Sequence, residues 1–306
     1  MKSNVNLSIT AIVPTKNRPI DLVKAIHSIC NQTRLPNELI VVDQSEDKLS
    51  MVAVQELLVD FQKIKLIYLY DPAIKGLVDA KRVSINYSSG DVICFLEDDV
   101  ILEREYLEQI ELGFIRNRKM MGCSGFITNQ PNSNSVYKIL FAIFHLGIFA
   151  DPRMRLCTKY YGYDNPLIAS NMISGGTSAW RRVVFDYTKF DVANGFHMYE
   201  DIDFSTRVAK YYIDALFINP NARLAHYFSP IGRDFLGVRQ RRKLKECFLY
   251  YKKRKNWNWA KSSFVWLLVG LFLESIVQSL VNKSIDPVFG YFFGFIDGLR
   301  SEVATD

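Results

Sequence analysis

The segment from Ser88 to Glu103, S-S-G-D-V-I-C-F-L-E-D-D-V-I-L-E, most constrains the fold of this chain. After a Gly-Asp turn signal, Val92–Leu96 is apolar, short and β-branched enough to form a strand that is buried on both faces. Glu97, Asp98 and Asp99 follow at once. Like charges at the end of a buried strand cost free energy unless a cation or a hydrogen-bond donor compensates them. The segment therefore indicates a divalent-ion site, with a solvated acidic loop as the alternative.

Strand and helix patterns alternate through the first third of the chain. Strands are expected at 7–13, 39–42, 64–70 and 92–96, and helices at 50–61, at 77–87 and from Pro19, where a proline suits the first helical turn. Such alternation predicts an α/β fold with a mostly parallel, Rossmann-like sheet and right-handed crossovers.

Polar residues follow several of these strands. Ligands of parallel sheets bind beyond the carboxyl ends of the strands, where residues 14–18, Asp43 and the acidic triplet all fall. Asp43 can accept hydrogen bonds from a base or ribose, although a lone aspartate after a strand is also a common turn former. A carboxylate-bound metal and a basic side chain would balance a diphosphate. These positions together indicate a nucleotide site.

The composition narrows the class of protein. The chain has 306 residues, of which 49% are hydrophobic, so it can bury one large core or two modest ones and is not disordered. Its five cysteines are far apart and mostly lie in apolar runs, which favours reduced core thiols over disulfides or a zinc site. No long apolar stretch opens the chain, so we expect the catalytic part to stay in the cytoplasm.

Four motifs of the first third resemble the family 2 glycosyltransferases, inverting enzymes that use nucleotide-diphospho-sugars and have the fold called GT-A. They are A-I-V-P-T-K-N-R-P at 11–19, V-V-D-Q-S at 41–45, G-L-V-D-A-K-R at 76–82 and G-D-V-I-C-F-L-E-D-D at 90–99. The resemblance implies that the nucleotide-sugar donor is bound by Pro14, Thr15, Arg18, Asp43, Gly76, Lys81 and Asp98.

The resemblance also gives these residues roles. Asp43 would contact the base, Lys81 would stand where many members carry a diphosphate-facing arginine, and Asp98 would face the ribose. Asp99 would bind the cofactor, Mn²⁺ or Mg²⁺. Glu97 departs from the first aspartate of the family's D-x-D motif, which makes Asp98 and Asp99 the preferred candidates.

Two stretches of the second half carry further candidates. Gly175 and Gly176, in M-I-S-G-G-T-S-A-W-R-R at 172–182, allow a backbone to approach a ligand before a helix expected near Arg181, although a tight turn explains them equally well. Glu200 and Asp201 open a probable helix, where they would either cap it or act as a general base.

The resemblance assigns these candidates to the acceptor side. It makes Asp201 the catalytic base with Glu200 as its neighbour, places Gly175 and Gly176 in the acceptor site, and puts His226 near the metal or diphosphate. Asp203 is better interpreted as structural. The apolar run 139–150 favours a buried helix over an interfacial segment, with His145 as a core or boundary residue.

The last seventy residues are basic and then apolar. Nine lysines and arginines crowd the segment 239–255 among aromatic residues, and the apolar stretches 264–273 and 288–296 follow. We expect helices that lie in or against the cytoplasmic face of the membrane, held there by the basic cluster. A helical hairpin packed on the catalytic domain is one alternative, and nucleic-acid binding by the basic segment is another.

These observations combine into one hypothesis. Residues 1–122 would bind the nucleotide sugar, 123–235 would complete the same GT-A domain on the acceptor side, and 236–306 would form a membrane-associated tail. The chain would be a metal-dependent inverting glycosyltransferase that acts on a glycan or polyprenyl-linked acceptor in surface polysaccharide synthesis. A catalytically inactive nucleotide-sugar-binding scaffold or sensor at the membrane is the alternative.

Overall fold

A computed structural model describes residues 6–59, 61, 63–130, 135–145, 149, 167–231, 234–254 and 261–304. The chain divides into two compact units. The first consists of residues 1–130, 156–190 and 204–232, and the second of residues 131–155, 191–203 and 233–306.

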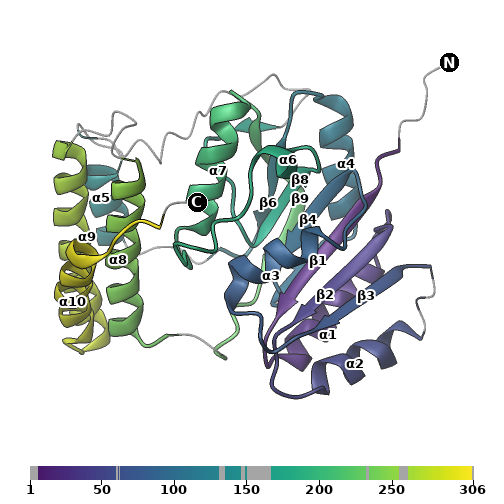
Figure 1. Ribbon diagram of the computed structural model, residues 1–306, viewed down its shortest axis with the longest axis horizontal. Helices are drawn as coiled ribbons and strands as arrows, with labels where there is room; N and C mark the ends of the chain where they lie inside the picture. The colour runs from purple at the N-terminus through teal and green to yellow at the C-terminus, as the bar shows by residue number, and fades with distance from the viewer. Residues whose placement is uncertain are drawn as a thin grey trace. The chain divides into compact units, whose positions relative to one another are not determined.

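The first unit begins with the predicted alternation of strands and helices (Figure 1). Strands β1 (Ile9–Thr15), β2 (Glu38–Asp43), β3 (Lys65–Tyr70) and β4 (Val92–Leu96) lie in the order β3-β2-β1-β4, and all three pairs are parallel. Helices α1 (Pro19–Cys30), α2 (Leu49–Leu58) and α3 (Gly76–Ile85) connect them. Parallel neighbours require such crossovers, so the carboxyl ends of all four strands reach one edge of the sheet.

The sheet continues as a mixed half, whose remaining strands are β5 (Val100–Leu102), β6 (Gly122–Ile127), β7 (Ile168–Ala169), β8 (Thr177–Arg181) and β9 (Leu216–His226). The full order is β3-β2-β1-β4-β8-β6-β9-β5, with β7 paired to β9. Strands β8 and β5 were not predicted. Arg181 ends β8, which pairs antiparallel with β4, and the short helix α6 (Val184–Tyr187) begins three residues later, close to the helix expected near Arg181. The short strand β5 precedes helix α4 (Tyr106–Arg116). A central strand buried on both faces lacks the alternation by which a strand is predicted.

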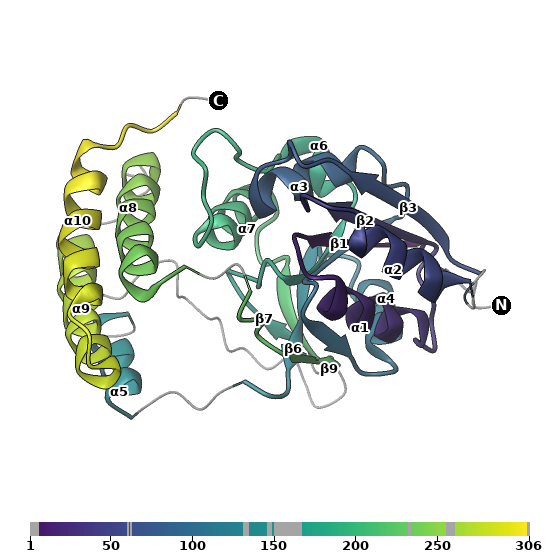
Figure 2. The same cartoon turned by 90° about the horizontal axis from the view of Figure 1, so that it is seen from below.

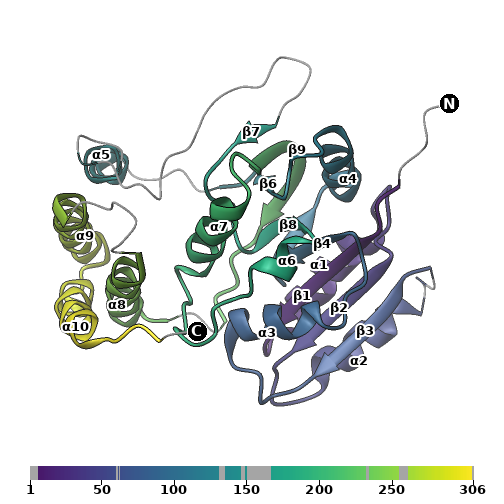
Figure 3. The ribbon, with the colours of Figure 1, turned by 45° about the horizontal axis from the view of Figure 1, so that its top comes forward.

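Helices cover both faces of this sheet (Figure 3). One hydrophobic cluster joins inward residues of β1 and β4 to α1, α2 and α4, and includes Ile26, Val54 and Phe114. The opposite cluster joins α3, α6 (Val184–Tyr187) and the later turns of α7 (Glu200–Tyr211), and includes Phe95 and Phe204. Because both faces are covered, the central strands β1, β2 and β4 are fully buried. The polar residues at their carboxyl ends, Thr15, Asp43, Asp98 and Asp99, are buried as well.

The second unit contains helices α5 (Ser135–Phe144), α8 (Leu236–Arg254), α9 (Lys261–Asn282) and α10 (Asp286–Arg300) (Figure 2). Helix α9 packs on the other three. Gly270 fits against the Phe144 ring of α5, Phe264 stacks on Tyr251 of α8 at 3.9 Å between ring centroids, and the Tyr291 hydroxyl of α10 donates to the Leu268 carbonyl.

Helix α9 is long and apolar enough to cross a membrane by length and composition. It also carries the buried carboxylate of Glu274, which accepts hydrogen bonds of 2.8 and 2.7 Å from the Lys243 ammonium of α8. The helix predicted within 139–150 is present as α5 up to Phe144, but its predicted burial was wrong for the described residues. Phe144 is the buried residue of α5, while Ile139 and Ile143 are exposed, because sequence hydrophobicity does not report which neighbours are present.

Candidate active site

The acidic triplet lies where β4 leaves the sheet. The parallel register pairs Ile12 of β1 with Phe95 of β4, so Thr15 at the end of β1 lies beside the triplet. Asp98 and Asp99 form the turn between β4 and β5, in which Asp98 faces Thr15 while Glu97 and Asp99 lie beside His226. The triplet therefore serves two different sets of partners.

Glu97 and Asp99 meet His226, the last residue of β9. The His226 Nε2 atom lies 2.9 Å from Glu97 Oε2 and 2.9 Å from Asp99 Oδ1. Each of the three residues offers one ligand atom, and these atoms lie within 4.8 Å of one another. Two carboxylate oxygens and an imidazole nitrogen form a donor set that can bind a divalent transition metal, whereas Mg²⁺ prefers oxygen ligands alone. The residues present therefore fit a divalent ion.

The pKa values of His226 and Asp99 in this cluster differ from their ordinary values. Burial disfavours the charged imidazole, but hydrogen bonds to Asp99 and Glu97 outweigh it and raise the pKa of His226 to about 9. Burial also opposes ionisation of Asp99, but hydrogen bonds from His226 and from the Ser229 amide, at 2.9 Å, together lower the pKa of that carboxyl. Without an ion, a protonated imidazole holds the two carboxylates together.

Asp98 points to the β1 side of the triplet. It accepts hydrogen bonds from the Thr15 hydroxyl at 2.7 Å and from Arg18 NH1 at 2.9 Å. Burial outweighs both partners and raises the pKa of Asp98 to about 6. The Arg18 guanidinium also donates through Nε to the Ile231 carbonyl at 3.1 Å, and so joins the loop after β9 to the acidic triplet.

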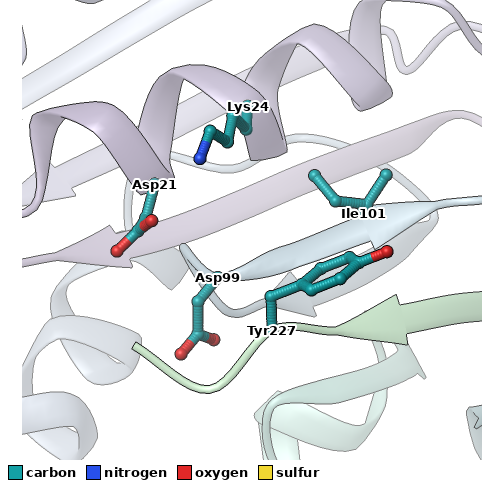
Figure 4. Close-up of a pocket in the computed structure, with 5 residues that line it drawn as sticks. All are labelled: Asp21, Lys24, Asp99, Ile101 and Tyr227. Atoms are coloured by element: carbon teal, nitrogen blue, oxygen red, sulfur yellow. The ribbon is translucent and has the colours of Figure 1, made fainter. Parts of the chain in front are cut away.

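A cavity of about 300 Å³ lies beside Asp99 (Figure 4). Helix α1 contributes Asp21 and Lys24 to it, β5 contributes Ile101, and the loop after β9 contributes Tyr227. A volume of this order is typical of the smaller ligand pockets of proteins.

Other predicted donor residues lie along the same edge of the sheet. Pro14 and Thr15 end β1. Asp43 ends β2 and is fully buried, and its carboxylate accepts hydrogen bonds from the Ser45 amide at 2.9 Å and the Tyr68 hydroxyl at 2.7 Å. Gly76 opens α3 with φ of +84°. Their contacts with a donor stay predictions.

Lys81 and the two glycines form a chain of contacts that ends at Glu97. The buried Lys81 ammonium donates to the Gly175 carbonyl at 2.9 Å and lies 5.5 Å from the centroid of the Phe95 ring. A Cβ atom on Gly176 would lie 2.3 Å from the Glu97 carboxyl carbon, and the Glu97 amide donates to the Gly176 carbonyl at 2.9 Å. These contacts position Glu97, while the predicted diphosphate contact of Lys81 and acceptor contact of the glycines stay predictions.

The carboxylates predicted for catalysis open α7 and belong to residues 191–203 of the second unit. Asp201 accepts a hydrogen bond from the Ile202 amide at 2.7 Å, and Glu200 is buried. The role of Asp201 as a base, facing Asp99, stays a prediction. Asp203 is buried beside Arg254 NH2 at 2.7 Å and Lys253 Nζ at 3.1 Å, which agrees with the structural role expected for it.

The structure adds Glu97 to Asp99 and His226, the two metal ligands predicted from the sequence. From the sequence, Asp98 is preferred for the ribose and Asp99 for the metal, because Glu97 departs from the family motif. Glu97 and His226 are brought together by the pairing of β5 with β9, which no local pattern of the sequence indicates.

Sequence comparison matches more than half of the chain, including the acidic triplet, to a known family. The model of the family described as glycosyl transferase family 2 matches residues 10–187. A GalNAc(5)-diNAcBac-PP-undecaprenol beta-1,3-glucosyltransferase of Campylobacter jejuni is 36% identical over 91 residues, and Glycosyltransferase GlyA of Streptococcus pneumoniae is 25% identical over 202 residues. These matches cover 30% and 61% of this chain, but 29% and 26% of the respective relatives.

Solved structures share the fold. A mannosyltransferase, PcManGT, of Pyrobaculum calidifontis superposes with a TM-score of 0.61 at 14% identity, covering 98% of this chain and 77% of that chain. GalNAc-T7 superposes with a TM-score of 0.60 at 13% identity, covering 91% and 58%. The predicted GT-A fold is therefore confirmed.

Proposed function

The chain belongs to glycosyl transferase family 2, and on that premise we propose that it transfers a sugar, with inversion, from a nucleotide-diphosphate donor to an acceptor hydroxyl. The observation that carries this proposal is the cluster of Glu97, Asp99 and His226 at the carboxyl end of β4. The edge of a parallel sheet is where such folds bind nucleotides.

Glu97, Asp99 and His226 would hold a divalent cation, for which we propose Mn²⁺ because two of the three donors are carboxylates. When bound, the ion supplies positive charge against the diphosphate that leaves. PcManGT and GalNAc-T7 are both described as complexes with Mn²⁺, the first with GDP-Man and the second with UDP and GalNAc.

Residues of the chain orient the donor around this cluster. The Arg18 guanidinium pairs with Asp98 and lies 3.9 Å from Asp99 Oδ2. It can therefore also pair with a diphosphate that binds beside these carboxylates. Asp98 would then be available to the ribose, and Asp43 would face the base. Lys81 would act by holding Gly175 in place.

Asp201 would be the general base. Its carboxylate would take the proton of the acceptor hydroxyl while that oxygen forms a bond to the anomeric carbon, and the bond from this carbon to the diphosphate oxygen breaks on the opposite face. One displacement of this kind inverts the anomeric configuration. The acidic first turn of α7, which carries Glu200 directly before Asp201, supports the assignment.

We propose a lipid-linked glycan as the acceptor and the cytoplasmic side of the cell membrane as the location. Two observations support a lipid-linked acceptor at a membrane. The Campylobacter relative is named for an undecaprenol-linked substrate, and α9 is long and apolar enough to cross a membrane. Assembly of a surface polysaccharide would use such an acceptor.

The test is transfer by the purified full chain. A panel of UDP- and GDP-sugars is screened by thermal shift with and without Mn²⁺, because a ligand that binds the folded form raises its stability. The best donor is then incubated with a polyprenyl-diphosphate-linked glycan, and the product anomer is read by NMR. We expect Asp201→Asn to abolish transfer while it keeps the donor-dependent thermal shift.

Asp214→Asn is the matched control, since Asp214 is exposed and has φ of +54°, which asparagine tolerates. Full transfer by Asp201→Asn would remove Asp201 from the role of base. A product with retained configuration would contradict the single displacement.

A further inference from the structure

Helix α10 exposes most of its large apolar side chains and buries its three glycines. The exposed fractions are 52% for Phe289, 51% for Phe292, 53% for Phe293, 42% for Ile296 and 58% for Leu299. Their spacing places these five residues on one face, which we call the aromatic face of α10. A helix of a water-soluble protein normally turns such a face toward the core.

Glycines fix this orientation. A Cβ atom on Gly290 would lie 2.2 Å from the Gly237 carbonyl oxygen, and one on Gly294 would lie 2.4 Å from the Arg241 carbonyl oxygen. A Cβ atom on Gly298 would lie 2.5 Å from the Phe248 ring. Helix α10 therefore packs through glycines directly on α8, as helices with small residues four apart do in membranes. No rotation could bury the phenylalanines without forcing side chains into α8.

Basic side chains lie next to the aromatic face. The Arg241 guanidinium is 5.8 Å from the centroid of the Phe293 ring. A hollow of about 530 Å³ begins at the same arginine and also carries Lys245 and Arg300, together with the acidic Asp297 and Glu302. Asp297 is paired with Arg241, with Nε and Oδ2 2.5 Å apart. The remaining basic side chains of the hollow, Lys245 and Arg300, are exposed.

Most of the basic cluster that the sequence assigned to membrane attachment instead has partners within the second unit. Ion pairs join Arg242 to Asp234, Lys243 to Glu274, Lys253 to Asp191 and Arg254 to Asp203. The Lys252 ammonium donates to carbonyl oxygens at the end of α10. These charges hold α8 to its neighbours, so attachment has to use other residues.

We propose that the aromatic face of α10 inserts into the boundary between headgroups and acyl chains of an anionic phospholipid bilayer, with Lys245 and Arg300 against the lipid phosphates. Aromatic side chains flanked by lysine and arginine are the composition that such boundaries favour. A second copy of the chain fits less well, since a two-fold contact through this face would bring Lys245 and Arg300 toward their own copies. The inference rests on the proposed membrane location and names its contact surface.

The test is flotation of the full chain with vesicles of phosphatidylcholine, with and without phosphatidylglycerol. We expect binding that is stronger to the vesicles containing phosphatidylglycerol. The double variant Phe289→Ser, Phe293→Ser should lower the partition coefficient by roughly tenfold or more, because two phenyl groups no longer enter the bilayer. Lys245→Gln with Arg300→Gln should lower it by roughly fivefold per charge and only for the anionic vesicles.

The matched control is Tyr211→Ser with Ile213→Ser, two exposed apolar residues of the first unit, which should bind like the unsubstituted chain. Thermal unfolding checks that each variant folds. Unchanged vesicle binding by the Phe289→Ser, Phe293→Ser variant would overturn the proposal. A dimer in sedimentation that this variant converts to a monomer, without any vesicle binding, would assign the face to a second copy instead.

Transfer to a soluble acceptor separates this inference from the proposed function. The Phe289→Ser, Phe293→Ser variant should keep that activity. If the chain binds vesicles but transfers no sugar, the proposed membrane contact of α10 is supported and the proposed sugar transfer is contradicted.

Discussion

Binding of Mn²⁺ should depend steeply on pH, because the ion has to displace a proton from His226. With a pKa of about 9, the imidazole is neutral in only about 1% of the free protein at pH 7. The apparent affinity should therefore rise about tenfold per pH unit from pH 6.5 to 8 and level off near pH 9. The proton costs about 2.7 kcal/mol of binding free energy at pH 7, since two pKa units separate the group from the solution.

Titration calorimetry measures this directly. Mn²⁺ is titrated into the chain at pH 6.5, 7, 7.5 and 8, in two buffers with different heats of ionisation. We expect release of about one proton per ion at pH 7. His226→Gln should bind weakly and lose the pH slope, whereas Asp214→Asn should keep both. A flat affinity with no proton release would refute the reasoning, because His226 would then be either uncharged or no ligand.

The same proton affects folding stability in the absence of metal. Because the pKa of His226 is higher in the folded than in the unfolded chain, its protonation stabilises the folded state. This contribution is fully present below pH 6.5 and disappears as the pH rises through 9. The shift of about 2.5 units corresponds to about 3 kcal/mol. Chemical unfolding of the metal-free chain should therefore show lower stability at pH 9 than at pH 6.5, and His226→Gln should reduce the difference.

Three further substitutions test individual contacts. Gly176→Ala should leave the melting temperature nearly unchanged but weaken Mn²⁺ binding roughly tenfold by calorimetry, because Glu97 can swing away from a Cβ that would be 2.3 Å from it; unchanged affinity would exclude Glu97 as a ligand. Lys81→Met should lower the free energy of unfolding in urea by about 1 kcal/mol, because the buried Gly175 carbonyl loses the Lys81 ammonium and keeps only the longer hydrogen bond, of 3.2 Å, from the Ser178 hydroxyl; an unchanged free energy would contradict the role of Lys81 in positioning this turn. Glu38→Gln should lower the free energy of unfolding by up to about 3 kcal/mol at neutral pH, because hydrogen bonds outweigh burial and lower the pKa of Glu38 to about 2. In urea unfolding this loss should shrink as the pH falls from 4.5 toward 2. A loss that does not depend on pH would contradict the prediction.

The parallel half of the sheet could be predicted because its signals are local. Each of β1 to β4 is a short apolar run, and Pro19 sits in the first turn of α1 as expected. The mixed half could not be predicted in the same way. Residues 177–181 form a strand because β4 and β6 lie on either side of them, and both partners are remote in the sequence.

The residues of the candidate metal site also divide into those predicted from the sequence and one that only strand pairing brings in. Asp99 and His226 were chosen because they match positions of a family motif, and the structure places them in one cluster. Glu97 joined them only once β9 was placed beside β5, which brings His226 opposite Val100. The departure of Glu97 from the family motif does not indicate how far it lies from His226, because that distance is set by the pairing of β5 with β9.

The sequence by itself determined the order of strands and helices in the first third, the acidic residues at the end of β4 and the family of the chain, since each is written within a few consecutive residues. Only the tertiary structure decided which carboxylates share His226, which lysines and arginines pair within the second unit, and which face of α10 stays exposed. Those outcomes depend on contacts between remote segments. The glycines of α10 let α8 approach on one side, and that approach leaves the phenylalanines on the other.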